Sequence, residues 1–247
     1  MRAREGPPPT HATEGKAAEG KAAEARRTSR AILAEPEKRL LTRLAALLPQ
    51  WVVPDYLTLL AVLAAFGIAV AYGLSNEDPR WLWAASLGLV VHWFGDSLDG
   101  TLARHRGIER PRYGFYVDHL ADAVATGAVG LGVGLSPYML LAVALALVVG
   151  YLILSINVYL ETITRAEFQL GYGLLGPTEA RLLLIALNTI ALAVGLAPFT
   201  VWGVGATLFD VAGVLGALSM GALLARRVVR NMRALGRLEP PGGQKGA

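Results

Sequence analysis

Six apolar segments, each close to the length that crosses a lipid bilayer, limit the folds open to this sequence. A bilayer takes about 20 consecutive apolar residues in a helix, and a soluble domain rarely contains several such runs. The chain is 54% hydrophobic and 17% charged, and turns rich in Gly, Pro, Asn or Asp separate several of the segments. We therefore predict an all-α integral membrane protein with six transmembrane helices. The expected spans are about 53–74, 81–103, 114–135, 138–159, 179–197 and 201–225.

Basic residues are distributed unevenly among the segments between these spans. If the N-terminus lies in the cytoplasm, 22 of the 23 Lys and Arg residues fall on the cytoplasmic side, and Arg80 alone falls outside. An excess of Lys and Arg in cytoplasmic loops is the usual signature of membrane orientation. The pattern predicts that both termini are cytoplasmic. A soluble helical bundle has no reason to segregate its basic residues in this way.

The segment before the first span divides into two parts. Residues 1–30 repeat Ala, Glu, Lys and Gly with few large apolar side chains, so we predict a disordered tail. Residues 31–49 place apolar side chains at helical spacing with basic residues between them, which is typical of an amphipathic helix lying on an anionic membrane surface. A solvated helix packed on a partner is the alternative. The transmembrane domain is expected at 50–230 and a cytoplasmic tail at 231–247.

Four aspartates lie at the cytoplasmic ends of the second and third expected spans. Asp96 and Asp99 are three residues apart. Asp118 and Asp122 are four apart, so each pair shares one face of its helix. An unpaired acid inside the membrane costs roughly 2.5–3.5 kcal/mol on insertion scales. Arg104 offers one positive charge, whereas two divalent cations would balance all four carboxylates.

Carboxylate oxygens are hard ligands that favour Mg²⁺, Mn²⁺ or Ca²⁺ over softer metals. The alternative is that the acids are solvated at helix ends or paired with loop arginines. Small residues flank the acids, which leaves room for a bulky ligand, and Arg104 could hold a phosphate. These flanking residues are Gly100, Ala103 and Gly114. Together they indicate metal-dependent phosphoryl or pyrophosphate chemistry at the cytoplasmic membrane face.

The same stretch resembles the signature of the CDP-alcohol phosphotransferases, also called CDP-alcohol phosphatidyltransferases. The pattern is DxxDGxxAR from Asp96, nine further residues, and then GxxxDxxxD from Gly114. The resemblance extends over about 32–230, because the six spans and the amphipathic helix also agree. It implies a transferase of phospholipid biosynthesis that moves a substituted phosphate from a CDP-alcohol donor to a lipid or polar alcohol acceptor and releases CMP.

The resemblance also implies a role for each residue of the signature. Two divalent cations, Mg²⁺ or Mn²⁺, would be held by Asp96, Asp99, Asp118 and Asp122. The cytidine and diphosphate would be lined by Gly100, Ala103, Arg104 and Gly114. Asp122 would double as the general base that deprotonates the acceptor alcohol.

Two further motifs bear on the substrates. At the first span, "VPDYLT" is similar to the family's Pro-Asn-x-x-Thr, with Asp55 where Asn is usual and Thr58 in place. Before the fifth span, "GPTE" resembles a stretch of the choline- and ethanolaminephosphotransferase branch. We expect Asp55, Thr58, Glu179 and Arg181 to orient substrate. Both motifs also fit plain helix-start chemistry, and a branch that uses phosphorylated inositol stays open.

Two other classes of membrane protein use acids in a similar way. One is a divalent-cation transporter, although transport sites normally lie near the membrane midplane between repeats. The other is a membrane prenyltransferase, whose two aspartate clusters lie far apart in sequence. Homodimerisation is implied by the family resemblance alone, and no nucleic-acid partner is expected.

Overall fold

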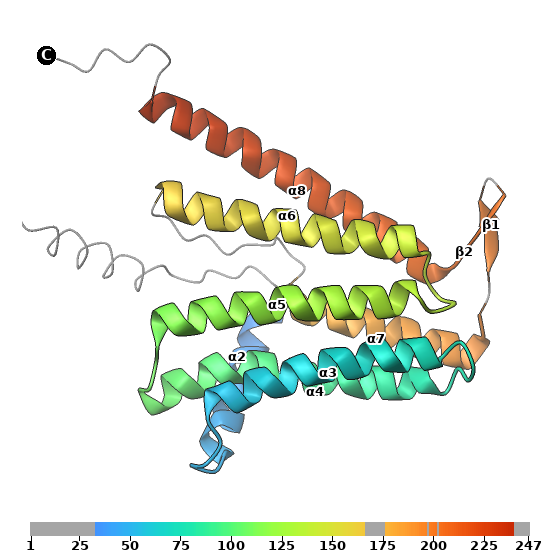
Figure 1. Ribbon diagram of the computed structural model, residues 1–247, viewed down its shortest axis with the longest axis horizontal. Coiled ribbons are helices and arrows are strands. Elements are labelled where there is room, and N and C mark those ends of the chain that lie inside the picture. The colour runs from blue at the N-terminus through green and yellow to red at the C-terminus, as the bar shows by residue number, and fades with distance from the viewer. Residues whose placement is uncertain (1–32, 166–175, 197, 202, 240–247) are drawn as a thin grey trace, which may run out of the picture.

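The computed structural model describes residues 33–165, 176–196, 198–201 and 203–239, and these residues form a helical bundle (Figure 1). The predicted disordered tail, residues 1–30, lies outside the described residues. The helices are α2 (Ala34–Leu47), α3 (Pro54–Leu74), α4 (Trp81–Arg106), α5 (Pro111–Gly134), α6 (Leu141–Arg165), α7 (Pro177–Val194) and α8 (Leu208–Leu238). A short antiparallel hairpin joins β1 (Phe199–Val201) to β2 (Val204–Ala206).

The start of the last expected span is wrong. Residues 201–225 were expected to be helical, but the chain first forms the hairpin, with Gly203 at a φ of 82° in its turn. α8 then begins at Leu208, because Thr207 caps it and Asp210 completes a capping box. The helix continues to Leu238, well beyond the apolar stretch, and its last turns are rich in arginine.

Four helices of the described chain are long and apolar enough to cross a membrane. They are α3, α6, α7 and α8. α4 and α5 have 26 and 24 residues and so have the necessary length, but they carry the charged residues of the acidic motif. The structure is thus that of an all-α membrane protein with four candidate spans.

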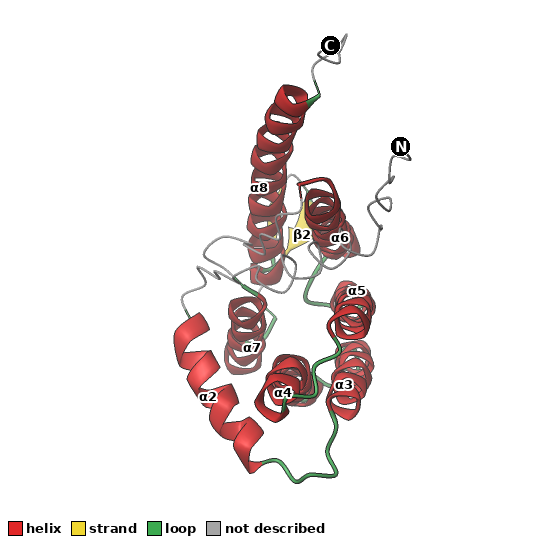
Figure 2. Ribbon diagram, turned by 90° about the vertical axis from the view of Figure 1, so that its left-hand side faces the viewer, coloured by secondary structure: helices red, strands yellow, loops and turns green. Residues whose placement is uncertain are grey.

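The helices pack in two groups that share α5. α3 packs against α4 and α5, α4 also packs against α2 and α7, and α6 packs against α5 and α8. Figure 2 shows α5 between α3 and α6, with α2 beside α4 and α7. α4 ends at Gly107, whose φ of 65° suits a helix C-terminus. Pro111 starts α5 four residues later. We call the end of the bundle that contains this turn the acidic end.

The main hydrophobic core lies toward the opposite end. It gathers the C-terminal turns of α3, α5 and α7 and the N-terminal turns of α4, α6 and α8. A buried polar network crosses it: Tyr72 donates to the Asn188 side-chain oxygen at 2.9 Å, and the Asn188 amide donates to Ser86 at 3.0 Å. Polar groups in apolar surroundings are stable only when hydrogen-bonded, so this network ties α3, α4 and α7 together.

Candidate active site

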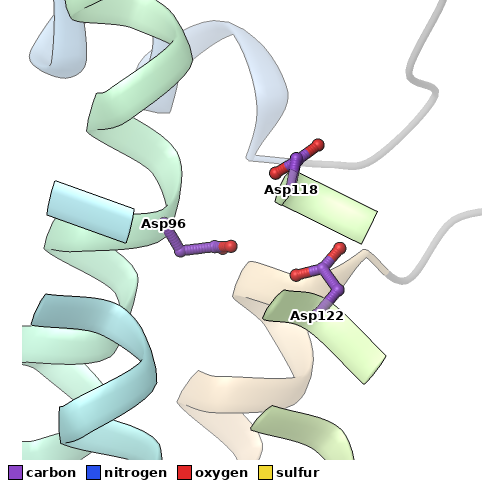
Figure 3. A group of neighbouring side chains, drawn as sticks. All are labelled: Asp96, Asp118 and Asp122. Atoms are coloured by element: carbon purple, nitrogen blue, oxygen red, sulfur yellow. The ribbon is translucent and has the colours of Figure 1, made fainter. Parts of the chain in front are cut away.

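Three of the four motif aspartates converge at the acidic end. Asp96 projects from α4, and Asp118 and Asp122 project from α5 (Figure 3). One carboxylate oxygen from each lies within 4.8 Å of the other two, and all three residues are partly buried. Three hard oxygen ligands at this spacing, contributed by two helices, are a donor set that fits a divalent cation. The i, i+4 spacing on α5 brings its two acids to one face, as the sequence predicted.

Asp99 lies at the interface between α3 and α4. Its Oδ2 accepts a 2.6 Å hydrogen bond from the Thr58 hydroxyl, and its Oδ1 accepts one from the Gly100 amide. Thr58 was expected to orient substrate, and the structure places its hydroxyl on a motif carboxylate instead of in open space. The Pro-x-x-x-Thr motif of the first span therefore contacts the acidic motif directly.

Arg181 brings a positive charge to the acidic cluster from a third helix. Its Nη2 lies 2.5 Å from Asp96 Oδ2, and the two side chains are 13% and 20% exposed. An ion pair shielded to this degree is weakly screened by solvent and salt. The sequence singled out Arg181 for a substrate role, and its contact with Asp96 ties α7 to the candidate metal centre.

The residues expected to bind CDP lie near the end of α4 and at the start of α5, on the two helices that carry the acids. Arg104 donates a 3.2 Å hydrogen bond to Thr101, and its Nη1 would lie 3.3 Å from a Cβ added at Gly100. A Cβ added at Gly114 would meet no atom within 4 Å, so the space beside Gly114 is open. Ala103 is half-buried on the same turn as Gly100. There is thus open space at Gly114, one turn before Asp118, and a guanidinium near the end of α4.

Asp55, the acid that stands where the family usually has Asn, forms an ion pair with Arg110. Arg110 also stacks over the Tyr113 ring, 4.0 Å from its centre. The hydrogen bond that Arg110 donates to Asp55 raises the pKa of the guanidinium above its usual value. The departure from the family pattern is therefore balanced by a basic residue in the turn between α4 and α5.

Glu179 of the "GPTE" motif contacts two backbone amides. Its Oε1 accepts from Leu33 N at 3.1 Å, just before α2, and its Oε2 accepts from Gly176 N at 2.9 Å, at the start of α7. The neighbouring Thr178 donates to Glu37 of α2 at 2.8 Å. The motif thus combines a helix-start function with a connection to α2.

Sequence reasoning missed Glu37 and its two partners on α4, Trp93 and Ser97. Glu37 lies four residues before Leu41 and eight before Ala45, so it shares the buried apolar face of α2, whereas Glu35 is exposed. An acid on an apolar face is a local signal for a buried polar contact, but its partners on α4 lie more than 50 residues away and cannot be identified from the sequence.

A family model for CDP-alcohol phosphatidyltransferase matches residues 51–222. Since the match covers more than half of the chain, the protein belongs to the CDP-alcohol phosphatidyltransferase family. It is an enzyme of phospholipid synthesis that transfers a substituted phosphate from a CDP-alcohol, and the family uses divalent cations. A search of curated proteins finds no match to the chain. The family resemblance is confirmed, and the transporter and prenyltransferase alternatives are set aside.

Proposed function

We propose that the acidic cluster is the active site, and that the chain transfers the substituted phosphate to the hydroxyl of a second alcohol and releases CMP. The observation that carries the proposal is the convergence of Asp96, Asp118 and Asp122 from two helices in a member of this family. The helices that carry the cluster also offer open space beside Gly114 and the guanidinium of Arg104. This arrangement suits a substrate that carries a diphosphate.

The donor set supports two divalent cations, Mg²⁺ or Mn²⁺, held by Asp96, Asp99, Asp118 and Asp122. When bound, such cations would neutralise the diphosphate and the charge that develops on the leaving group. Asp99 would need to share its carboxylate between a cation and the Thr58 hydroxyl, because Thr58 donates to its Oδ2. That hydrogen bond fixes the orientation of the carboxylate.

In the proposed reaction Asp122 accepts the proton of the acceptor hydroxyl. The hydroxyl oxygen forms a new bond to the β-phosphorus of the CDP-alcohol, and the bond from that phosphorus to the oxygen bridging the two phosphates breaks. The electron pair of the broken bond leaves with CMP. Gly100, Ala103, Arg104 and Gly114 would line the cytidine and diphosphate, with the Arg104 guanidinium on a phosphate oxygen.

The "GPTE" stretch supports a reaction like that of the choline- and ethanolaminephosphotransferase branch, with diacylglycerol as acceptor and CDP-choline or CDP-ethanolamine as donor. Arg181 forms an ion pair with Asp96, so its positive charge is partly neutralised within the site. A phosphorylated inositol acceptor would require further basic groups and is the second choice.

Purified protein in liposomes should release CMP from at least one CDP-alcohol when Mg²⁺ or Mn²⁺ is present. Chelation with EDTA should abolish release, and restored Mn²⁺ should recover it, because the clustered carboxylates need a counter-cation. CMP release should be assayed with a panel of CDP-alcohols and acceptor alcohols. Mass spectrometry of the lipid product then identifies the donor and the acceptor that react. Absence of CMP release with every donor, in preparations that still bind Mn²⁺, would contradict the proposed function.

We also propose six transmembrane helices, with α4 and α5 crossing beside the four candidate spans and α2 lying at the membrane interface. The domain bounds proposed are 31–49 for the interfacial segment, 50–230 for the membrane domain and 231–247 for a cytoplasmic tail. The distribution of Lys and Arg supports cytoplasmic termini and a cytoplasmic acidic end. Family resemblance supports a homodimer.

Orientation can be measured with single cysteines, because the chain contains none. Glu109 lies in the turn at the acidic end and Glu77 in a turn at the opposite end, and both are exposed. We expect a membrane-impermeant thiol reagent to label E77C, and not E109C, in right-side-out vesicles. Inside-out vesicles should give the reverse pattern, and labelling of both variants from one side would refute the proposed orientation.

A further inference from the structure

One carboxylate of α2, that of Glu37, contacts both α4 and α7. Glu37 Oε1 accepts hydrogen bonds from Trp93 Nε1 of α4 at 2.6 Å and from the Thr178 hydroxyl of α7 at 2.8 Å. The Ser97 hydroxyl of α4 lies at 3.4 Å from the same oxygen. One acid of α2 therefore contacts the two helices that lie beside α2 in Figure 2, α4 and α7.

A second carboxylate makes the reciprocal contact. Glu179 of α7 accepts from the Leu33 amide at the start of α2 and from the Gly176 amide at the start of α7. Charged acceptors form stronger hydrogen bonds than neutral ones. Together, Glu37 and Glu179 hold the N-terminal turn of α2 against the N-terminal turn of α7.

Apolar packing continues the same contact along α4. Leu41 and Ala45 of α2 are buried in one cluster with Leu98 and Leu102 of α4, both of which are fully buried. Leu98 lies between the two acids of the α4 motif. α2 therefore packs against the turn of α4 that presents Asp96 and Asp99.

The contacts of α2 lead to the acidic cluster by two routes. On α4, Ser97 is the residue next to Asp96. On α7, Thr178 lies three residues before Arg181, whose guanidinium is 2.5 Å from Asp96. Glu37 thus contacts α4 and α7, two of the three helices whose side chains meet at Asp96, without itself belonging to the cluster.

We propose that Glu37 is a positioning residue, and that α2 is a brace that sets the affinity of the acidic cluster for its cations by fixing α4 and α7 against each other. The inference rests on the proposed function of the cluster as a metal centre. Groups that orient metal ligands from outside the ligand set typically change metal affinity by 10- to 100-fold. In this proposal, α2 changes how tightly the acidic cluster binds its cations, although α2 contributes no ligand.

Binding of Mn²⁺, measured by electron paramagnetic resonance on the full-length protein in detergent, tests the brace. We expect E37A to weaken Mn²⁺ binding by about tenfold. T178V removes the hydroxyl at almost constant volume and should weaken binding in the same direction, whereas T178S should retain it. E35A is the matched control, because Glu35 is an exposed acid on the same helix and should bind Mn²⁺ as the unchanged protein does.

A second readout separates positioning from general loss of structure. If the brace acts through metal affinity, raising Mn²⁺ should restore CMP release in T178V and E37A, which a collapsed fold would not permit. Unchanged Mn²⁺ affinity in both variants would overturn the brace while leaving the proposed reaction intact.

If the unchanged protein binds Mn²⁺ but never releases CMP, the proposed reaction fails, and the affinities of the variants still decide the role of Glu37. Should E37A not fold, the comparison of T178V with T178S decides the matter.

Discussion

Replacement of Asp122 by Asn should lower kcat by about a thousandfold, within the range that a general base contributes, while the CDP-alcohol still binds. The amide keeps the size of the side chain and one oxygen ligand, but it cannot accept the proton of the acceptor hydroxyl. Steady-state CMP release and binding of a CDP-alcohol to the purified variant measure the two effects separately.

D78N is the matched control, because Asp78 lies in the turn between α3 and α4, where it accepts from the Arg80 amide. Its activity should match that of the unchanged protein. Normal turnover by D122N would show that another group removes the proton, and Asp122 would then be a metal ligand alone.

Replacement of Gly95 by Ala should destabilise the bundle and reduce activity. The added Cβ would lie 2.5 Å from the Leu57 carbonyl oxygen and 2.9 Å from the Ala61 nitrogen. These are backbone atoms that cannot rotate away, so α3 and α4 would have to separate. Overpacking of this kind costs about 1–3 kcal/mol. Separation would also strain the 2.6 Å hydrogen bond between Thr58 and Asp99.

The thermal unfolding midpoint in detergent and the rate of CMP release measure the effect of G95A. G67A is the matched control, because Gly67 is also in a helix, on α3, and a Cβ there meets no atom within 4 Å. The control should be at least as stable as the unchanged protein, since Ala favours helix more than Gly. Equal midpoints for the two variants would show that α3 and α4 do not depend on close approach at Gly95.

The sequence predicted the helical class and most helix positions because apolar length and Gly or Pro turns are local signals. The sequence also predicted that Asp96, Asp118 and Asp122 lie together at one end of the bundle, because helical spacing and a short turn between the two helices determine that geometry. The hairpin before α8 was missed because most of its residues are apolar, so the part from 201 to 206 was assigned to the start of the sixth span. Gly203, Gly205 and Thr207 are the local signals that a turn and a helix start lie there.

The parts of the site that could not be predicted depend on contacts between distant segments. Asp55 presented an unexplained fifth acid until the structure placed Arg110 beside it. Glu179 was assigned to substrate, but its oxygens contact backbone amides at the starts of α2 and α7. Helical periodicity gives the face on which a residue lies, and it does not give the helix that will cover that face.

The arrangement of two helix groups around α5 has a consequence for the carboxylates that this helix carries. Gly132 of α5 faces the backbone of α3 at Ala69, and Gly130 faces Val148 of α6, with no room for a methyl group at either position. α5 is thus wedged between its neighbours two or more helical turns away from Asp122. Small changes of side-chain volume along this seam can adjust how far the acids of α5 stand from Asp96, so the spacing of the ligands can evolve through residues that touch neither cation nor substrate.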